Sequence, residues 1–459
     1  KEKDMKLYTN RRNPVLPPEW HMPDSEAHVM PDGKLYLYGS FDDGKHIYCS
    51  SRYHVVSTPD MEHWTIHDCS FDSSRISWAW DPASPRYPGI DWEHPSPFIQ
   101  KMMREKPEAH PDLVKEEKPE EEQDLDSEGR KPHLLYAPDG IEKNGKYYLY
   151  FCMDDDREGV AVSDRPEGPF DGAVQLPCGG IDPAVFVDDD GQAYYYWGQI
   201  NAHGVKLHED MMSFCREDVV DNLVTEEQHY FHEGSSVRKI GDTYYYVFAD
   251  VERGKPTSLG YATGKSPLGP FTYRGIIIDN ADCDPDSWNN HGSIECFNGQ
   301  WYVFYHRSSR GTESFRRLCV EPITINPDGS IDEVKMTSQG AGEPFGPGEE
   351  IMGYQACGLK GTVRIAPDKD GCDRLMEISD GDEAVFRYVK SGTGFAVLHL
   401  EASGSGTVEV FLDGKSAGAI RITDGQQEKT EIGGEAGCRE VVLKFTETER
   451  LEIRSLTFG

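Results

Sequence analysis

GQAYYYWG at residues 191–198 shows most clearly a pattern that recurs along the chain, a glycine followed by an aromatic-rich segment. The other copies are GKLYLYGS from Gly33, GKYYLYFC from Gly145, GDTYYYVF from Gly241 and GQWYVFYH from Gly299. Aromatic and β-branched residues favour strands, and a glycine supplies the backbone angles of the turn before them. Five copies predict a repeat architecture built from strands.

A second motif follows most of the copies and completes the repeat. It is a strand, a turn rich in Asp, Pro or Gly, and a closing aromatic residue, as in VSTPDMEHW (56–64), AVSDRPEGPF (161–170), KLHEDMMSF (206–214) and YATGKSPLGPF (261–271). From residue 145 onward the repeat glycines are about fifty residues apart, the size of a four-stranded propeller blade. We therefore expect an all-β protein in which residues 1–345 form a five-bladed β-propeller.

The pattern changes near Pro347. The remaining segments FAVLHLEAS, GTVEVFLDGKSAGAIRI, REVVLKF and RLEIRSLTF alternate apolar and polar residues in short runs. Such alternation is typical of a β-sandwich. We expect a second domain over residues 350–459, joined to the first through the linker GAGEPFGPGEE.

Composition narrows the range of partners. The chain has 81 acidic and 47 basic residues and a formal charge of −34, which repels nucleic acids and anionic lipid surfaces but not a neutral sugar. We expect no nucleic-acid or membrane partner; the oligomeric state stays open. The 11 cysteines are scattered, without a CxxC motif or zinc-ligand spacing, which favours mostly buried free thiols and a cytoplasmic protein, or a secreted one whose signal peptide was removed.

Four titratable residues occupy the same place in different repeats. Asp24, Asp182, Glu233 and His291 each precede their repeat glycine by eight or nine residues, whereas the second repeat has Ala137 there. Because the first strand of every blade lines the propeller axis, these side chains are expected to converge at one end of the channel. Taken singly, each aspartate also suits a turn or strand-entry position.

Glycoside hydrolysis needs such a set of groups. One carboxylic acid protonates the leaving oxygen, and one carboxylate activates water or attacks carbon. A third carboxylate helps to keep the acid protonated. His291 is either a hydrogen-bonded core residue or a weak calcium ligand, with the ion held largely through waters. Asp42 and Asp43 are expected in a solvated turn.

The long interval between the first two repeats has two parts. Trp78, Trp80 and Trp92 lie in the first part, where they either stack on a sugar or pack within the loop. The second part, residues 106–133, is dense in Glu, Lys and Pro. This composition is typical of a solvated insertion, and the alternative is a lid or a partner contact.

These motifs resemble glycoside hydrolase family 43, whose members are five-bladed propellers with an inverting Asp, Asp, Glu trio. The resemblance covers residues 10–345 and includes MPDSEAHVMPDGKLYLYGS, LLYAPDGIEKNGKYYLYF, GGIDPAVFVDDDGQAYYYWG, HEGSSVRKIGDTYYYVFAD and NNHGSIECFNGQWYVFYHR. It implies Asp24 as general base, Asp182 as modulator of the acid and orienter, and Glu233 as general acid. His291 matches the axial histidine of the family, beside which calcium is expected.

The family also has a substrate-binding arginine in a segment like FRRLCVEP. Arg316 fits this role best by its distance from Glu321, because Arg317 points to the opposite face of the strand. Around the base this chain departs from the family pattern, and Glu26 is a competitor of Asp24. The C-terminal domain resembles the family 6 carbohydrate-binding modules; a packing role is the alternative, since no tryptophan follows Trp301.

We therefore expect an inverting glycoside hydrolase that releases arabinose or xylose from plant cell-wall polysaccharides or oligosaccharides, as an α-L-arabinofuranosidase or β-xylosidase. Trp78, Trp80, His291 and Arg316 are the candidate substrate contacts. Inversion requires the acid and the base to stand about 6.5–9.5 Å apart. The alternatives are an endo-arabinanase or galactan-degrading glycosidase, a fructan hydrolase or phosphorylase, and a sugar-binding propeller without catalysis.

Overall fold

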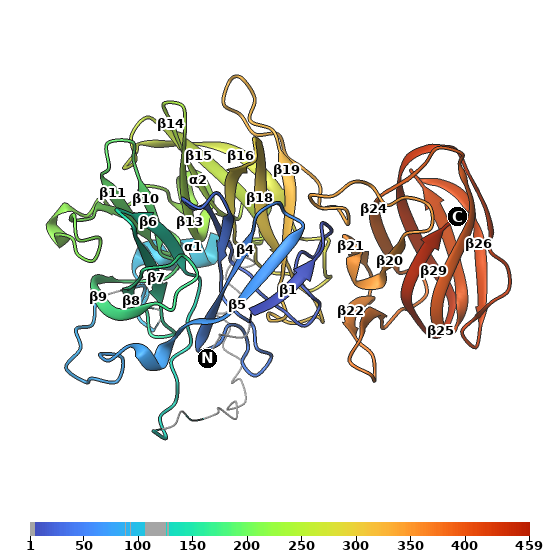
Figure 1. The fold of residues 1–459 in the computed structure, drawn as a ribbon, viewed down its shortest axis with the longest axis horizontal. Coiled ribbons are helices and arrows are strands. Elements are labelled where there is room, and N and C mark those ends of the chain that lie inside the picture. Colours follow the sequence, from blue (N-terminus) through green and yellow to red (C-terminus); the bar gives the residue numbers. More distant parts are fainter. Residues whose placement is uncertain (1–4, 88, 92, 106–124, 126–127) are drawn as a thin grey trace.

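The computed structural model describes residues 5–87, 89–91, 93–105, 125 and 128–459. Five small sheets surround a central axis, and a larger sheet follows toward the C-terminus (Figure 1). Trp92 and most of the insertion at residues 106–133 lie outside the described residues. None of the helices in the described part of the chain is long and apolar enough to cross a membrane.

The five small sheets are the blades of the predicted propeller. The first blade contains β1 (Met5–Thr9), β2 (Glu26–Val29), β3 (Leu35–Tyr38), β4 (Arg52–Thr58) and β5 (His63–Asp72). The second contains β6 (Asp139–Lys143), β7 (Lys146–Cys152), β8 (Arg157–Ser163) and β9 (Asp171–Gly179), and the third contains β10 (Ala184–Val187), β11 (Ala193–Trp197) and β12 (His203–Lys206). The fourth contains β13 (Phe231–Ile240), β14 (Thr243–Asp250), β15 (Ser258–Gly264) and β16 (Phe271–Asp279), and the fifth contains β17 (Ser293–Phe297), β18 (Gln300–Arg307) and β19 (Arg317–Ile323).

In every blade the aromatic segment of the repeat forms the strand that pairs with the innermost strand. Each pairs antiparallel with a strand on both sides, as β11 does with β10 and β12. Their buried rings fill the space between neighbouring blades: the centroids of Tyr150 and Tyr195 are 5.3 Å apart, and those of Tyr196 and Tyr246 are 5.6 Å apart. The turn glycine Gly191 has a φ of +83°, which glycine adopts without strain.

Residues near the N-terminus complete the fifth blade. The amide of Val15 donates to Leu318 O over 2.9 Å. Asn13 binds the backbone of Val320 in both directions, through its Nδ2 at 2.9 Å and its Oδ1 at 3.0 Å. Residues 13–15 thus lie beside β19, while β1 pairs with β5 at the outer edge of the first blade. The same short segment closes the ring.

Ten strands, all within residues 350–458, make up what we call the C-terminal region. They are β20 (Glu350–Met352), β21 (Gly358–Lys360), β22 (Arg364–Pro367), β23 (Asp373–Met376), β24 (Glu383–Ser391), β25 (Phe395–Leu412), β26 (Lys415–Thr423), β27 (Gln426–Gln427), β28 (Glu431–Gly434) and β29 (Gly437–Phe458). The region has a hydrophobic core of its own, built from residues 345–458. This arrangement fits a sandwich; the domain limits at 345 and 350 remain predictions.

Short helices connect some of these strands. They are α1 (Pro97–Glu105), α2 (Glu226–His229) and the 3-10 turns η1 (Ser73–Arg75), η4 (Arg216–Asp218) and η5 (Gly353–Gln355). All the cysteines are free thiols, and six of them are buried.

Ion pairs and a backbone hydrogen bond join the C-terminal region to the propeller. Asp373 on β23 receives hydrogen bonds from Arg317 and, at 3.2 Å, from Arg310. Arg364 binds Asp286 at 2.6 Å, and the amide of Arg310 donates to Ile365 O at 3.0 Å. Figure 1 shows β21 and β22 on the side of the region that faces the propeller.

Candidate active site

The structure brings the four repeat-equivalent residues together at the axis. His291 Nδ1 lies 3.7 Å from Asp24 Oδ1 and 3.8 Å from Asp182 Oδ2. Asp24 and Asp182 precede β2 and β10 and share a left-handed backbone, with φ of 60° and 56°. Such strained angles in non-glycine residues cluster at functional sites, because the surrounding structure must hold them. Glu233 joins from β13, at a break in its pairing with β14.

Asp24 lies in surroundings that favour its charged form. Arg316 Nη1 donates to its Oδ1 over 3.2 Å, and Ser40 Oγ donates to its Oδ2 over 2.6 Å. Burial alone would raise the pKa of Asp24, but Arg316, His291, His306 and Ser40 together bring it below its ordinary value. Asp24 is therefore a carboxylate at neutral pH, as a general base must be.

Arg316 is held in place by a second carboxylate, Asp42. Its Nε and Nη2 donate to Asp42 Oδ2 and Oδ1 over 3.0 and 2.9 Å, and its own amide also binds Asp42. Asp42 is only 1% exposed, so the expected solvated position is wrong for this residue. Its partner is distant in sequence, so the local turn pattern gave no sign of the pair.

Asp182 and Glu233 form the opposite side of the site. Burial, then the charges of Glu233 and Asp24, raise the pKa of Asp182 well above its ordinary value, against the amide of Gly234. Glu233 Oε2 accepts a hydrogen bond from Gln199 Nε2 at 2.8 Å. Asp182 therefore holds its proton more tightly than an ordinary aspartate, because a second charge beside Glu233 is unfavourable in this buried place. The site thus combines a carboxyl that favours its protonated form with an ionised base.

Arg317 and Glu26, the alternatives to Arg316 and Asp24 in the sequence analysis, have other partners. Arg317 points away from the axis and binds Asp373 of the C-terminal region. Glu26 accepts from Arg238 Nη2 at 3.1 Å and lies 3.9 Å from His28 Nε2, and burial and Asp139 raise its pKa to about 7. The guanidinium that pairs with Glu26 comes from β13, whereas Asp24 is paired with Arg316.

The two described tryptophans of the insertion lie in loops around the second blade. Trp78 stacks on Phe151 with centroids 6.2 Å apart, and its Nε1 donates to Ala173 O over 3.0 Å. This is the loop packing that the sequence left as an alternative. Trp80 is covered by Arg130, whose Cζ is 3.9 Å from the ring centroid, and it lines a cavity of about 530 Å³. Sugar stacking by Trp80 stays a prediction.

Sequence reasoning missed three groups that touch the axial residues. Ser40 and His306 contact Asp24, and Gln199 contacts Glu233. Each of them follows the glycine of its own repeat by seven or eight residues, at the end of the aromatic strand. Applying the offset rule after the glycine, as well as before it, would have identified them.

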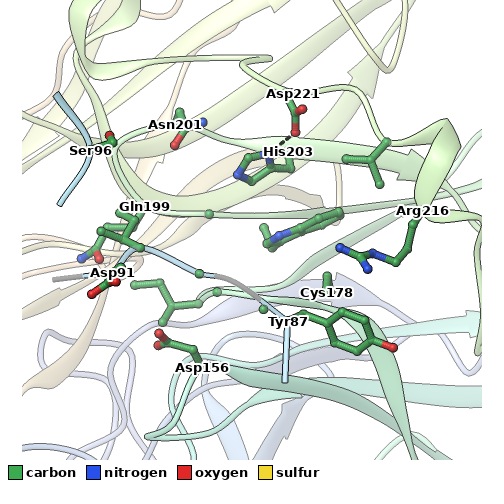
Figure 2. Close-up of a pocket in the computed structure, with 18 of the residues that line it drawn as sticks. Tyr87, Asp91, Ser96, Asp156, Cys178, Gln199, Asn201, His203, Arg216 and Asp221 are labelled. Atoms are coloured by element: carbon green, nitrogen blue, oxygen red, sulfur yellow. Dashed lines mark hydrogen bonds and ion pairs between the residues drawn. The ribbon is translucent and has the colours of Figure 1, made fainter. Parts of the chain in front are cut away.

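A larger cavity, of about 770 Å³, adjoins this site. Figure 2 shows side chains from the second and third blades and from the insertion around it, among them Tyr87, Asp156, Gln199 and Arg216. Gln199 lines the cavity while it binds Glu233. The cavity therefore meets the axial site at Gln199, the hydrogen-bond partner of Glu233.

The protein groups around His291 do not by themselves form a calcium cage. Among the described residues, groups of three ligand atoms within 4.8 Å of one another occur elsewhere, and the buried one contains Glu26, His28 and Asp139. Arg238 already donates to that Glu26 carboxylate. Calcium prefers six to eight oxygen ligands, so an ion beside His291 needs water for most of its shell.

Comparison with known proteins shows the family of this chain. The sequence profile of glycosyl hydrolases family 43 matches residues 113–331. A xylosidase/arabinosidase from Thermoclostridium stercorarium is 30% identical over 93% of this chain and 89% of its own length. A β-xylosidase/α-arabinofuranosidase of this family from a compost metagenome, solved with xylotriose in a calcium-free form, has a TM-score of 0.53 at 28% identity, covering 72% of this chain and 99% of its own.

A further solved structure extends the likeness in fold to nearly the whole chain. The family 43 arabinoxylan arabinofuranohydrolase from Bacillus subtilis covers 98% of this chain and 99% of its own, with a TM-score of 0.51 at 23% identity. The repeat, the converging carboxyls and these relatives point to one assignment. The chain belongs to glycosyl hydrolases family 43 and is a glycoside hydrolase.

Proposed function

We propose that the protein is an inverting glycosidase that releases arabinose or xylose from plant cell-wall polysaccharides or their oligosaccharides. The observation that carries the proposal is the contrast between two buried carboxyls. Arg316 holds Asp24 as an anion, whereas Glu233 receives a hydrogen bond from the neutral amide of Gln199 and lies beside Asp182, whose pKa is raised well above its ordinary value by burial and by the neighbouring carboxylates. One base and one acid are thus available at the same pH.

In the proposed reaction Asp24 accepts a proton from a water molecule as that water attacks the anomeric carbon. Glu233 gives its proton to the glycosidic oxygen, so the bond to the leaving group breaks while the new bond to water forms. Asp182 helps to retain that proton on the pair before the reaction. Arg316 fixes the direction of Asp24 and remains near the sugar.

The names of the relatives support arabinose and xylose as the released sugars. The bacterial relative of 30% identity is a xylosidase/arabinosidase, and the metagenomic enzyme was solved with xylotriose. For the C-terminal region we keep the resemblance to family 6 modules as a proposal. We also propose calcium beside His291, since the metagenomic enzyme was solved in a calcium-free form. The metal content of the purified protein tests this proposal.

The test compares leaving groups. We expect the wild-type protein to hydrolyse 4-nitrophenyl α-L-arabinofuranoside or β-D-xyloside with inversion, followed by NMR of the product anomer. Glu233→Ala should lose about 10²–10⁴-fold of kcat on an oligosaccharide, because the poor leaving group needs a proton, and less on a dinitrophenyl glycoside. Asp24→Ala should lose activity on both substrates.

Two results would contradict the proposal. A Glu233→Ala variant as active as the wild type would favour a propeller that binds sugars without catalysis. A first product with retained configuration would exclude the inverting mechanism. Glu62→Ala, on the surface of the first blade, serves as the control and should leave all rates unchanged.

A further inference from the structure

The cavity of about 770 Å³ opens from one particular side of the axial site. Gln199, which lines it, belongs to the third blade and binds Glu233 of the fourth. Asp24 is held from the other side, by Ser40 of the first blade and Arg316 at the start of the last strand of the fifth. The first and fifth blades are neighbours in the ring, so the cavity lies on the side of the acid and away from the base.

The outer wall of this cavity comes from the insertion between the first two blades. A Cβ at Gly179 would lie 2.4 Å from Tyr87 O, so the two backbones touch directly. Ile99 of α1 packs against Ile200, which follows Gln199, and both are buried. Lys101 also binds Glu227 of α2 at 2.7 Å. The described part of the insertion is therefore docked on the propeller beside the acid.

The lining suits a sugar chain. Tyr87 presents a half-buried ring, and Arg216 Cζ lies 4.7 Å from its centroid. Figure 2 shows this pair at the end of the cavity opposite Gln199. Between them Asn201 and His203 offer polar groups. An aromatic face with a few polar groups is typical of a built binding pocket, and this volume lies within the range of such pockets.

We propose that this cavity binds the leaving group of the reaction, the neutral sugar chain that departs when Glu233 protonates the glycosidic oxygen. The inference rests on the proposed function, because the acid must touch that oxygen and the sugars beyond it must then lie on the side of the acid. Tyr87 is the stacking platform farthest from the bond that breaks. Gln199 binds the acid Glu233 and also lines the cavity, so it lies between the acid and the first sugar of the chain.

Charge defines the class of chain further. Asp91, Glu217 and Asp221 line the cavity together with one guanidinium, that of Arg216. An excess of carboxylates repels an anionic ligand over distances up to about 10 Å at 0.1 M salt. The cavity therefore selects neutral xylose or arabinose chains over chains that carry uronic acids.

Chain length separates this proposal from the proposed function. Tyr87→Ala should lower kcat/KM on a tetrasaccharide about tenfold, the effect of one lost stacking contact, and leave kcat/KM on the single-ring 4-nitrophenyl glycoside within about twofold. The matched control is Tyr148→Ala, a partly buried tyrosine of the second blade that lines neither cavity. It should change neither value, whereas Trp80→Ala tests the other cavity.

Calorimetry gives a readout without turnover. In the Glu233→Gln background, the tetrasaccharide should bind more tightly than the monosaccharide, and Tyr87→Ala should remove this difference. Loss of tetrasaccharide activity in Trp80→Ala instead would assign the leaving group to the other cavity and overturn the proposal. Equal losses on both substrates in Tyr87→Ala, or none, would overturn it too. A wild type inert on every glycoside contradicts the proposed function itself, which is a different result.

A second experiment varies the charge of the sugar chain. An otherwise equal oligosaccharide with a uronic acid on the leaving side should have a kcat/KM several-fold lower at low salt, and the difference should shrink as salt is added. Glu217→Gln with Asp91→Asn should reduce the discrimination. Equal rates on neutral and anionic chains at low salt would contradict the role of the carboxylates.

Discussion

Arg316 places one buried positive charge between two buried carboxylates. Asp42 takes two of its side-chain hydrogen bonds and Asp24 takes another. A charge in such a place is tolerated only when its hydrogen bonds are satisfied. Asp42 thus fixes the guanidinium, and the guanidinium fixes both the direction and the ionisation of Asp24. The base is prepared before any substrate arrives.

Removing this charge should change the pH dependence of catalysis. Burial alone would raise the pKa of Asp24, and the pKa lies below its ordinary value because Arg316, the largest of the opposing contributions, acts together with His291, His306 and Ser40. Catalysis needs the ionised base, so activity falls as the pH drops through that pKa. In Arg316→Met burial prevails, the pKa of Asp24 rises, and the acidic limb of kcat/KM should move upward by about 1–3 pH units.

Two further variants make this measurement specific. Arg316→Lys keeps the positive charge, so the acidic limb of kcat/KM should lie close to that of the wild type. The two-pronged contact with Asp42 is lost in this variant. Arg253→Met removes an exposed positive charge of the fourth blade that pairs with Asp279 and Glu333, and it should leave the limb unmoved. An unshifted profile in Arg316→Met would contradict the role of Arg316 in ionising the base.

Repeat offsets predict positions along the axis but not partners across it. The offset before each glycine identified Asp24, Asp182 and Glu233, which the structure brings to one site. It gave no sign of Asp42, because the pair with Arg316 depends on how the fifth blade meets the first. Pairings between distant segments follow from the closed ring, and a single sequence records them only as isolated polar residues.

Among the elements, the segment before β2 closes the propeller. The fifth blade has three strands of its own, and residues 13–15 lie along its last strand. Asn13 makes further bonds to Glu321 and to Thr337 O. Closure by the N-terminal end means that the first and fifth blades share one edge.

Asn13→Ala should therefore destabilise the propeller. It removes the bonds on both sides of Val320 and leaves buried polar groups unpaired, at a cost of about 2–4 kcal/mol. Urea unfolding followed by circular dichroism measures the effect, and activity at low temperature should persist. Arg11→Ala breaks only an exposed pair with Glu62 and should cost about 0–1 kcal/mol. Equal stability of the two variants would argue against closure at Asn13.

The repeat predicted the number of blades but not their strand counts. Its aromatic segments became β3, β7, β11, β14 and β18, each in the interior of its sheet. Those strands are recognisable because burial on both sides demands aromatic residues. Edge strands meet solvent, carry a weaker pattern and vary: the third and fifth blades have three strands, and the first has five.

The C-terminal region is connected to the active site at the start of β19. Arg316 and Arg317 are neighbours, and they point to opposite sides: one binds Asp24 and the other binds Asp373. Asp373 also binds Arg310, at the other end of the loop that leads to Arg316. The region therefore holds both ends of the loop that carries the arginine of the site.

Asp373→Asn should lower both stability and activity. Breaking a buried ion pair costs about 3–5 kcal/mol, because the remaining charges lose their partner. As Arg316 loses its support, the acidic limb of kcat/KM should also shift upward, though less than in Arg316→Met. Asp286→Asn is the control: it removes a carboxylate from the same interface, but an exposed one that binds Arg364.

A shift of the acidic limb in Asp286→Asn equal to that in Asp373→Asn would mean that the interface acts only through general stability. An unchanged limb in Asp373→Asn, with stability alone reduced, would show that the loop keeps Arg316 in place without the C-terminal region. Thermal unfolding and the pH profile, measured on the same preparations, separate these outcomes.

The adjacent arginines also limit how such chains can be recombined, in nature or by design. A propeller transplanted onto another C-terminal module would expose or bury Arg317 without a counter-charge, one residue from the group that ionises the base. Only modules that bring a carboxylate to the place of Asp373 would be compatible. We therefore expect the propeller and the C-terminal region to be inherited together. The residue that links them, Arg317, does not contact the substrate.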